Sequence, residues 1–151
     1  MKGFRCTRWA FSLLAASLLA LGGCTGLVMG KISATNSAPV PPERLYPGPQ
    51  PANHEPSGQL VVLRDYNVRA DACLTQIHIN GVQRADLYTA NRATLRLAPG
   101  THRFEMTLGG KLCLTSLAIG PTALNATVLV EADRETVYIL RDMPLRLDRL
   151  Q

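Results

Sequence analysis

Hydrophobic and polar residues alternate along most of the chain after residue 59. On either side of Pro99-Gly100 the apolar residues fall at every second position, as Ala93-x-Leu95-x-Leu97 and as Phe104-x-Met106-x-Leu108. A period of two is typical of a β-strand with one buried face. Such runs are separated by Gly, Pro and Asn about every eight to twelve residues, as in sandwiches and barrels. The predicted strands are residues 60–64, 73–79, 82–87, 93–98, 101–108, 111–119, 126–131 and 136–141.

The turns between these runs support an all-β domain over residues 59–151, a small antiparallel β-sandwich of about seven or eight strands. Pro99-Gly100 predicts one hairpin, and Asn80-Gly81 predicts another. A plain two-residue turn at the second site would aim Arg84 and Asp86 inward. We therefore expect a β-bulge at Gly81, which takes a positive φ at low cost and would turn Ala85 and Leu87 inward instead.

The first 23 residues follow a different pattern, typical of a secretory signal peptide. Three basic residues and no acidic ones lie within residues 1–8, and residues 9–21 are apolar except for Ser12 and Ser17. An apolar helix of that length spans about 20 Å, which is short of the roughly 30 Å hydrocarbon core of a bilayer.

This run ends in Leu21-Gly22-Gly23-Cys24, which resembles the lipobox of bacterial lipoprotein precursors. The resemblance implies cleavage between Gly23 and Cys24, with palmitate and other acyl chains on Cys24 as a lasting membrane anchor. Residue 25 is Thr rather than Asp, which for such lipoproteins implies the periplasmic face of the outer membrane. The alternative is an uncleaved anchor, because a weakly apolar run that continues to Met29 is long enough to cross a bilayer.

Residues 24–58 read as a flexible linker. The part from Gly30 to Gly58 contains seven prolines and few large apolar residues, so it cannot fold alone. As an extended polyproline spacer it would reach at most about 90 Å from the membrane. The alternative is a binding segment, because Leu45 and Tyr46 are apolar groups that could dock onto the domain.

Part of the domain also resembles the PEGA-like β-sandwich modules of uncharacterised bacterial lipoproteins. The similar stretches are Leu74-Thr-Gln-Ile-His-Ile-Asn-Gly81, Ala85-Asp-Leu87, Leu95-Arg-Leu-Ala-Pro-Gly-Thr-His-Arg-Phe104 and Tyr138-Ile-Leu-Arg141. The shared features are turns and strand patterns. The resemblance therefore implies a fold and supplies no active site.

The four cysteines sort by their place in the chain. Cys6 lies in the signal peptide and Cys24 in the lipobox, which leaves Cys73 and Cys113 inside the domain. Both share the phase of inward-facing apolar residues, and exported proteins form disulfides. We predict a Cys73–Cys113 disulfide that closes a loop of about 40 residues and stabilises the fold by roughly 3–4 kcal/mol. The alternative is two buried free thiols.

Charge and motifs argue against several functions. The chain carries a net charge of +5, but three of its 16 basic residues lie in the signal peptide, and no long run of like charge follows. We therefore expect no nucleic-acid partner. His54, His78 and His102 lack metal-ligand spacing, and neither a Gly-x-Ser-x-Gly nor a Walker motif occurs. We expect no metal, no cofactor and no enzymatic activity.

These observations favour a non-catalytic, lipid-anchored protein of the cell envelope that serves as a structural or protein-interaction module. Its candidate partners are the membrane, through the lipid, and other envelope proteins. The alternative is a glycan- or peptide-binding module, which would need exposed aromatic rings. In the domain only Tyr66, Tyr88 and Tyr138 could supply them.

Overall fold

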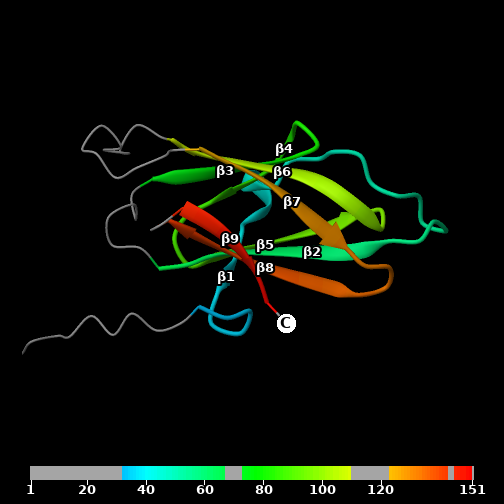
Figure 1. Ribbon diagram of the computed structural model, residues 1–151, viewed down its shortest axis with the longest axis horizontal. Coiled ribbons are helices and arrows are strands. Elements are labelled where there is room, and N and C mark those ends of the chain that lie inside the picture. Colours follow the sequence, from blue (N-terminus) through cyan, green and yellow to red (C-terminus); the bar gives the residue numbers. More distant parts are fainter. Residues whose placement is uncertain (1–31, 67–72, 110–122, 143–144, 151) are drawn as a thin grey trace, which may run out of the picture.

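The computed structural model describes residues 32–66, 73–109, 123–142 and 145–150, which form two packed β-sheets (Figure 1). The all-β class is thereby confirmed. The elements in chain order are β1 (Ala38–Pro39), the 3₁₀ helix η1 (Pro42–Arg44), β2 (Gly58–Arg64), β3 (Leu74–Ile79), β4 (Val82–Leu87), β5 (Asn91–Leu97), β6 (Gly100–Gly109), β7 (Ala123–Val130), β8 (Glu135–Asp142) and β9 (Leu145–Arg149).

Seven of the predicted strands correspond to β2 through β8, with ends displaced by a few residues. The eighth, at residues 111–119, lies outside the described residues. Two observed strands were not predicted. β1 has only two residues and one of them is proline, while β9 follows β8 so closely that its alternation was not recognised as a separate strand.

The sheets have the orders β1-β5-β2-β8-β9 and β4-β3-β6-β7. The sandwich is mainly antiparallel, as predicted, but two pairings are parallel: β1 with β5, and β2 with β8. Parallel neighbours need a long connection between them. The connection between β2 and β8 is long because it contains β5 of the same sheet and all four strands of the other sheet.

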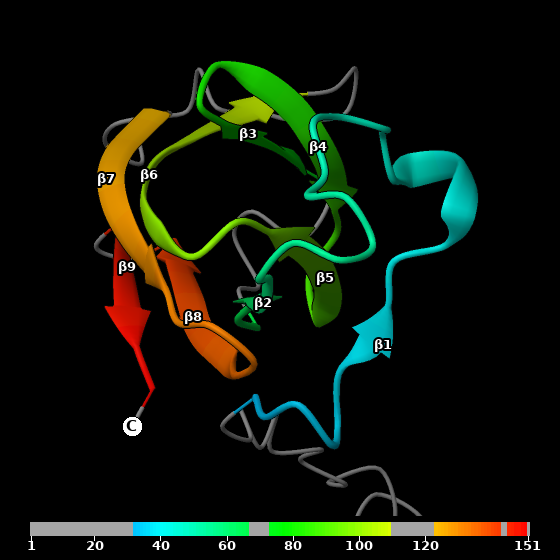
Figure 2. The same ribbon diagram turned by 90° about the vertical axis from the view of Figure 1, so that its right-hand side faces the viewer.

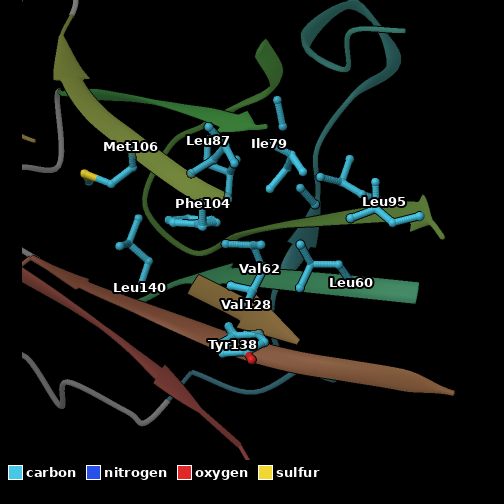
Figure 3. Close-up of a cluster of buried hydrophobic side chains, with 14 of the residues drawn as sticks. Leu60, Val62, Ile79, Leu87, Leu95, Phe104, Met106, Val128, Tyr138 and Leu140 are labelled. Carbon is cyan, nitrogen blue, oxygen red and sulfur yellow. The ribbon is translucent and has the colours of Figure 1, made fainter. Parts of the chain in front are cut away.

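The main core lies between the two sheets (Figure 3). Phe104 and Met106 of β6 are fully buried there, as their alternation predicted, and Leu140 of β8 faces them from the other sheet. The buried hydrophobic members of this core are Val40, Leu60, Val62, Ile77, Ile79, Ala85, Leu87, Ala93, Leu95, Leu97, Phe104, Met106, Val128, Val130, Tyr138 and Leu140.

The turn between β3 and β4 contains two residues, both in the left-handed region, with φ of 53° at Asn80 and 82° at Gly81. Ile79 pairs directly with Val82, so the bulge is not at Gly81 as predicted. The register shifts further along, between Ile77 and His78, opposite the stretch from Gln83 to Ala85. The consequence for the core is the predicted one, because Ala85 and Leu87 are fully buried.

A second apolar cluster covers the outer face of the five-stranded sheet. Val61 and Leu63 of β2 and Ile139 of β8 pack there against Ile32, which lies before the first strand. All residues from Leu60 to Arg64 are consequently almost fully buried. The chain before residue 59 therefore contributes to the stability of the sandwich.

Candidate functional site

Residues 32–57, which we call the strap, run along one side of the sandwich (Figure 2). β1 pairs with β5 at the edge of one sheet, and Leu45 forms a bridge with Ala85 of β4 at the edge of the other. Pro39, Pro41 and Pro42 lie beside these contacts. Because proline has no backbone N–H, these positions cannot donate a hydrogen bond to a further strand. Residues 38–46 therefore lie against the domain, as in the alternative to a free spacer.

One polar contact of the strap centres on Asp86, a residue that is only 6% exposed. The hydroxyl of Tyr46 donates a hydrogen bond to Asp86 Oδ2 at 2.6 Å, and Gln83 Nε2 donates to Oδ1 at 2.9 Å. The hydrogen bond to Asp86 raises the pKa of Tyr46 above its ordinary value, with further contributions from burial and from the negative charge of Asp86. The pair therefore holds the phenol in its neutral form.

Arg44 makes the second polar contact of the strap. Its guanidinium lies 4.8 Å from the centre of the Tyr88 ring, and its Nη1 donates to Asn91 Oδ1 at 3.1 Å. Asn91 Oδ1 also accepts a hydrogen bond from the Tyr88 N–H at 3.0 Å. Arg44 thus fixes the strap to the connection between β4 and β5.

A pocket of about 400 Å³ lies at one end of the sandwich, between the strap, the β3–β4 hairpin and the turn from β5 to β6. The predicted hairpin at Pro99-Gly100 is wrong, because this turn carries the chain from β5 in one sheet to β6 in the other and the two strands do not pair. The loop from η1 to β2 runs past this end in Figure 1. The pocket has an apolar part and a polar part. Its lining residues are Pro49, Gln50, Pro51, Glu55, Ile79, Asn80, Val82, Arg84, Leu97, Ala98 and His102.

Arg84 is the unusual member of this lining, because it is only 3% exposed. Its Nη1 donates to the carbonyl oxygen of Pro49 at 3.3 Å, and its Nε has no hydrogen-bond partner. Among the described residues it forms no ion pair. Burial lowers the pKa of Arg84 accordingly. A buried cation without a counter-charge is costly and favours the approach of an anion.

His102 and Asn80 form a fixed wall of the same pocket. His102 Nε2 lies 2.8 Å from the carbonyl oxygen of Ala98, and Nδ1 lies 3.0 Å from Asn80 Nδ2. These partners suit a neutral ring in which Nε2 donates and Nδ1 accepts. Asn80 Oδ1 is also engaged, because it accepts from the Arg103 N–H at 2.9 Å.

Most residues predicted for signal cleavage, lipidation or disulfide formation lie outside the part of the chain that the structure describes. Gly23, Cys24 and Cys113 are outside the described residues. Cys73 is 4% exposed and shares the inward phase of Ile77, as the sequence predicted. Its pairing with Cys113 stays a prediction.

The residues considered for ligand binding are scattered. Within the described ranges no three His, Cys, Asp or Glu side chains gather where they could hold a metal ion. Tyr138 is buried, and its hydroxyl oxygen accepts a hydrogen bond from the Leu129 N–H at 3.0 Å. Tyr88 carries Arg44 on its ring, while Tyr66 is 40% exposed. With Tyr138 buried, only Tyr66 and Tyr88, which is 45% exposed, remain as exposed rings for the aromatic platform that glycan binding would need.

Sequence reasoning missed the pocket and the polar contacts of the strap. Asp86 and Arg84 looked like ordinary outward residues of a strand, because nothing near them in the sequence indicates that residues 44–49 cover that face. One signal was available. Leu45 and Tyr46 are large apolar side chains in a proline-rich stretch, which is why docking of this segment is the alternative to a free spacer.

In the part of the chain that the structure describes, no helix has the length and apolar character that crossing a membrane requires. A search against protein-family models, curated proteins and solved structures found no match for this chain.

Proposed function

We propose that this protein is a lipid-anchored module of the cell envelope, attached through Cys24, with a structural or protein-interaction role. The proposal rests on the leader and on Leu21-Gly22-Gly23-Cys24, together with an all-β fold of the kind used for contacts. The contacts of Tyr46 and Arg44 hold the strap against the sandwich.

The docked strap is the observation that carries the structural part of this proposal. Ile32 is buried against the sandwich, so the tether between Cys24 and the docked chain comprises only residues 24–31. An extended chain covers about 3.3–3.6 Å per residue, which limits this tether to about 30 Å. A free linker up to residue 58 would have reached about 90 Å. The module therefore works next to the membrane and reaches partners there.

Substitution of the lipobox cysteine tests the anchor. In cells fed labelled palmitate, the wild-type chain should incorporate label and lose residues 1–23, whereas Cys24→Ala should remain unlabelled and unprocessed. Cys6→Ala is the matched control and should behave like the wild type. Equal labelling of Cys24→Ala would reject the lipid anchor, and a wild-type chain that keeps its first 23 residues without label would favour the uncleaved anchor.

The short tether has a separate test. Inserting about 25 Gly-Ser residues after Gly30 should increase the distance between the domain and the membrane, measured by fluorescence transfer from a label on the domain to a dye in the bilayer. The same insertion into the exposed turn at Asp133 is the control, and it should leave the transfer unchanged. Equal transfer from the wild-type chain and the long-tether variant would contradict close attachment.

A further inference from the structure

We propose that the pocket between the strap, the β3–β4 hairpin and the β5–β6 turn binds a small carboxylate with an apolar tail, and that Arg84 supplies the counter-charge. The inference is independent of membrane anchoring. It depends on the chemistry of three parts of the pocket.

The charged part is Arg84. Its guanidinium is almost completely buried, yet the described residues offer it only the carbonyl oxygen of Pro49, at 3.3 Å. Carbonyl oxygens are dipoles and do not neutralise a cation. A carboxylate in the pocket would accept charge-assisted hydrogen bonds from the guanidinium.

The apolar part explains why an organic acid fits better than an inorganic anion. Ile79, Val82 and Leu97 line the pocket, and Pro49 and Pro51 of the strap lie across from the strands. A volume of about 400 Å³ is near the lower limit for small-molecule sites. The fitting ligand is thus a short aliphatic or amino-acid-like acid.

The third part is the wall of His102 and Asn80. Both ring nitrogens of His102 and the side-chain oxygen of Asn80 already have partners, so these residues need not rearrange when a ligand enters. Arg84 is therefore the residue of the pocket that distinguishes a charged ligand from a neutral one.

Glu55 also lines the pocket and opposes an anion. Its carboxylate is held at the strap, where Oε2 accepts from the Ala52 N–H at 2.8 Å. Glu55 is exposed, so solvent screens its repulsion. Its removal should strengthen binding of a carboxylate, which gives a variant that changes affinity in the direction opposite to loss of Arg84.

The test is a titration of the full-length chain, in an uncharged detergent, with 3-methylbutanoate. The N–H signals of arginine side chains, observed by NMR, report occupancy. The acid should bind saturably and shift the Arg84 signal, whereas 3-methylbutanamide and inorganic phosphate should bind at least tenfold more weakly. Equal binding of the amide or of phosphate would overturn the proposed ligand class.

Variants separate the site from the fold. Arg84→Met should weaken binding of the acid at least tenfold and leave the denaturation midpoint unchanged or higher, because it removes a buried charge. Glu55→Gln should strengthen binding about twofold or more. Arg103→Gln is the control, since Arg103 is exposed and pairs with Glu105. Unchanged affinity in Arg84→Met, or in Glu55→Gln if the former does not fold, would overturn the assignment of this pocket.

Discussion

The hydroxyl of Tyr46 donates a hydrogen bond of 2.6 Å to Oδ2 of Asp86, joining the strap to β4 across 40 residues of chain. Asp86 is buried, and its other oxygen is engaged by Gln83. The strap therefore completes the hydrogen bonding of a carboxylate that it also covers.

Removal of this hydroxyl should loosen the strap. Tyr46→Phe leaves one oxygen of a buried carboxylate without its partner, which destabilises the fold. We expect a lower midpoint of denaturant unfolding and faster proteolysis within residues 41–50. Tyr66→Phe, at an exposed tyrosine, is the control and should change neither. Identical proteolysis of the two variants would show that the contact does not hold the strap.

The same pair predicts a loss of stability at alkaline pH. The pKa of Tyr46 in the folded protein is raised above 10.0, chiefly by the hydrogen bond to Asp86, so the folded state keeps this proton to a higher pH than the unfolded state does. The resulting stabilisation is complete below about pH 10 and is lost as the pH rises through the folded pKa. Unfolding of the wild type and of Tyr46→Phe should be compared from pH 7 to pH 11.5. The difference in their stability should stay constant up to about pH 9 and shrink above pH 10, and a constant difference throughout would contradict the assignment.

Gly58 should tolerate no side chain. A Cβ at this position would lie 2.0 Å from the carbonyl oxygen of Glu131 and 2.8 Å from Val130 Cγ1. Gly58→Ala should therefore cost about 3 kcal/mol, at the upper end of the usual range for overpacking. Gly109→Ala is the matched control, because no atom of the described residues lies within 4 Å of its Cβ, and it should change stability by about 0.5 kcal/mol or less. Similar unfolding midpoints for the two variants would place the start of β2 farther from the end of β7.

Phe104 tests the packing between the sheets. Its side chain is fully buried, and truncation to alanine would leave a large cavity in a small domain. Phe104→Ala should lower the free energy of unfolding by roughly 3–5 kcal/mol in denaturant titrations. Thr101→Ala on the exposed side of the same strand is the control. A loss below about 1 kcal/mol would mean that the core collapses around the cavity.

The Cys73–Cys113 disulfide remains to be tested by chemistry. Alkylation of the denatured protein, read by mass, should label neither of the two cysteines before reduction and both after it. Reduction should also lower stability by roughly 3–4 kcal/mol. If both are labelled without reductant, they are free thiols, and the buried position of Cys73 reflects packing alone.

The sequence predicted best where the reason for burial is local. Alternation along β5 and β6 identified Leu95 and Phe104 as inward residues, because every second side chain of a strand meets the same face. Asn80-Gly81 predicted a turn for a similar reason, since both residues tolerate positive φ.

Prediction failed where burial depends on distant chain. Val61 and Leu63 are buried on the outer face because Ile32 and other distant residues cover them, and Arg84 lies beneath the strap where it crosses β4. The parallel pairing of β2 with β8 has no local signal either, because the residues of neither strand indicate which strand it pairs with.

That parallel pairing also orders the events of folding. β2 lies between β5 and β8 in its sheet, and Gln59 near the start of the domain pairs with Glu135 near its end. Pairings between such distant segments form slowly. If the chain is exported amino terminus first, as proposed, this sheet cannot be completed until β8 has emerged. The β2–β8 pairing would then form only near the end of translocation.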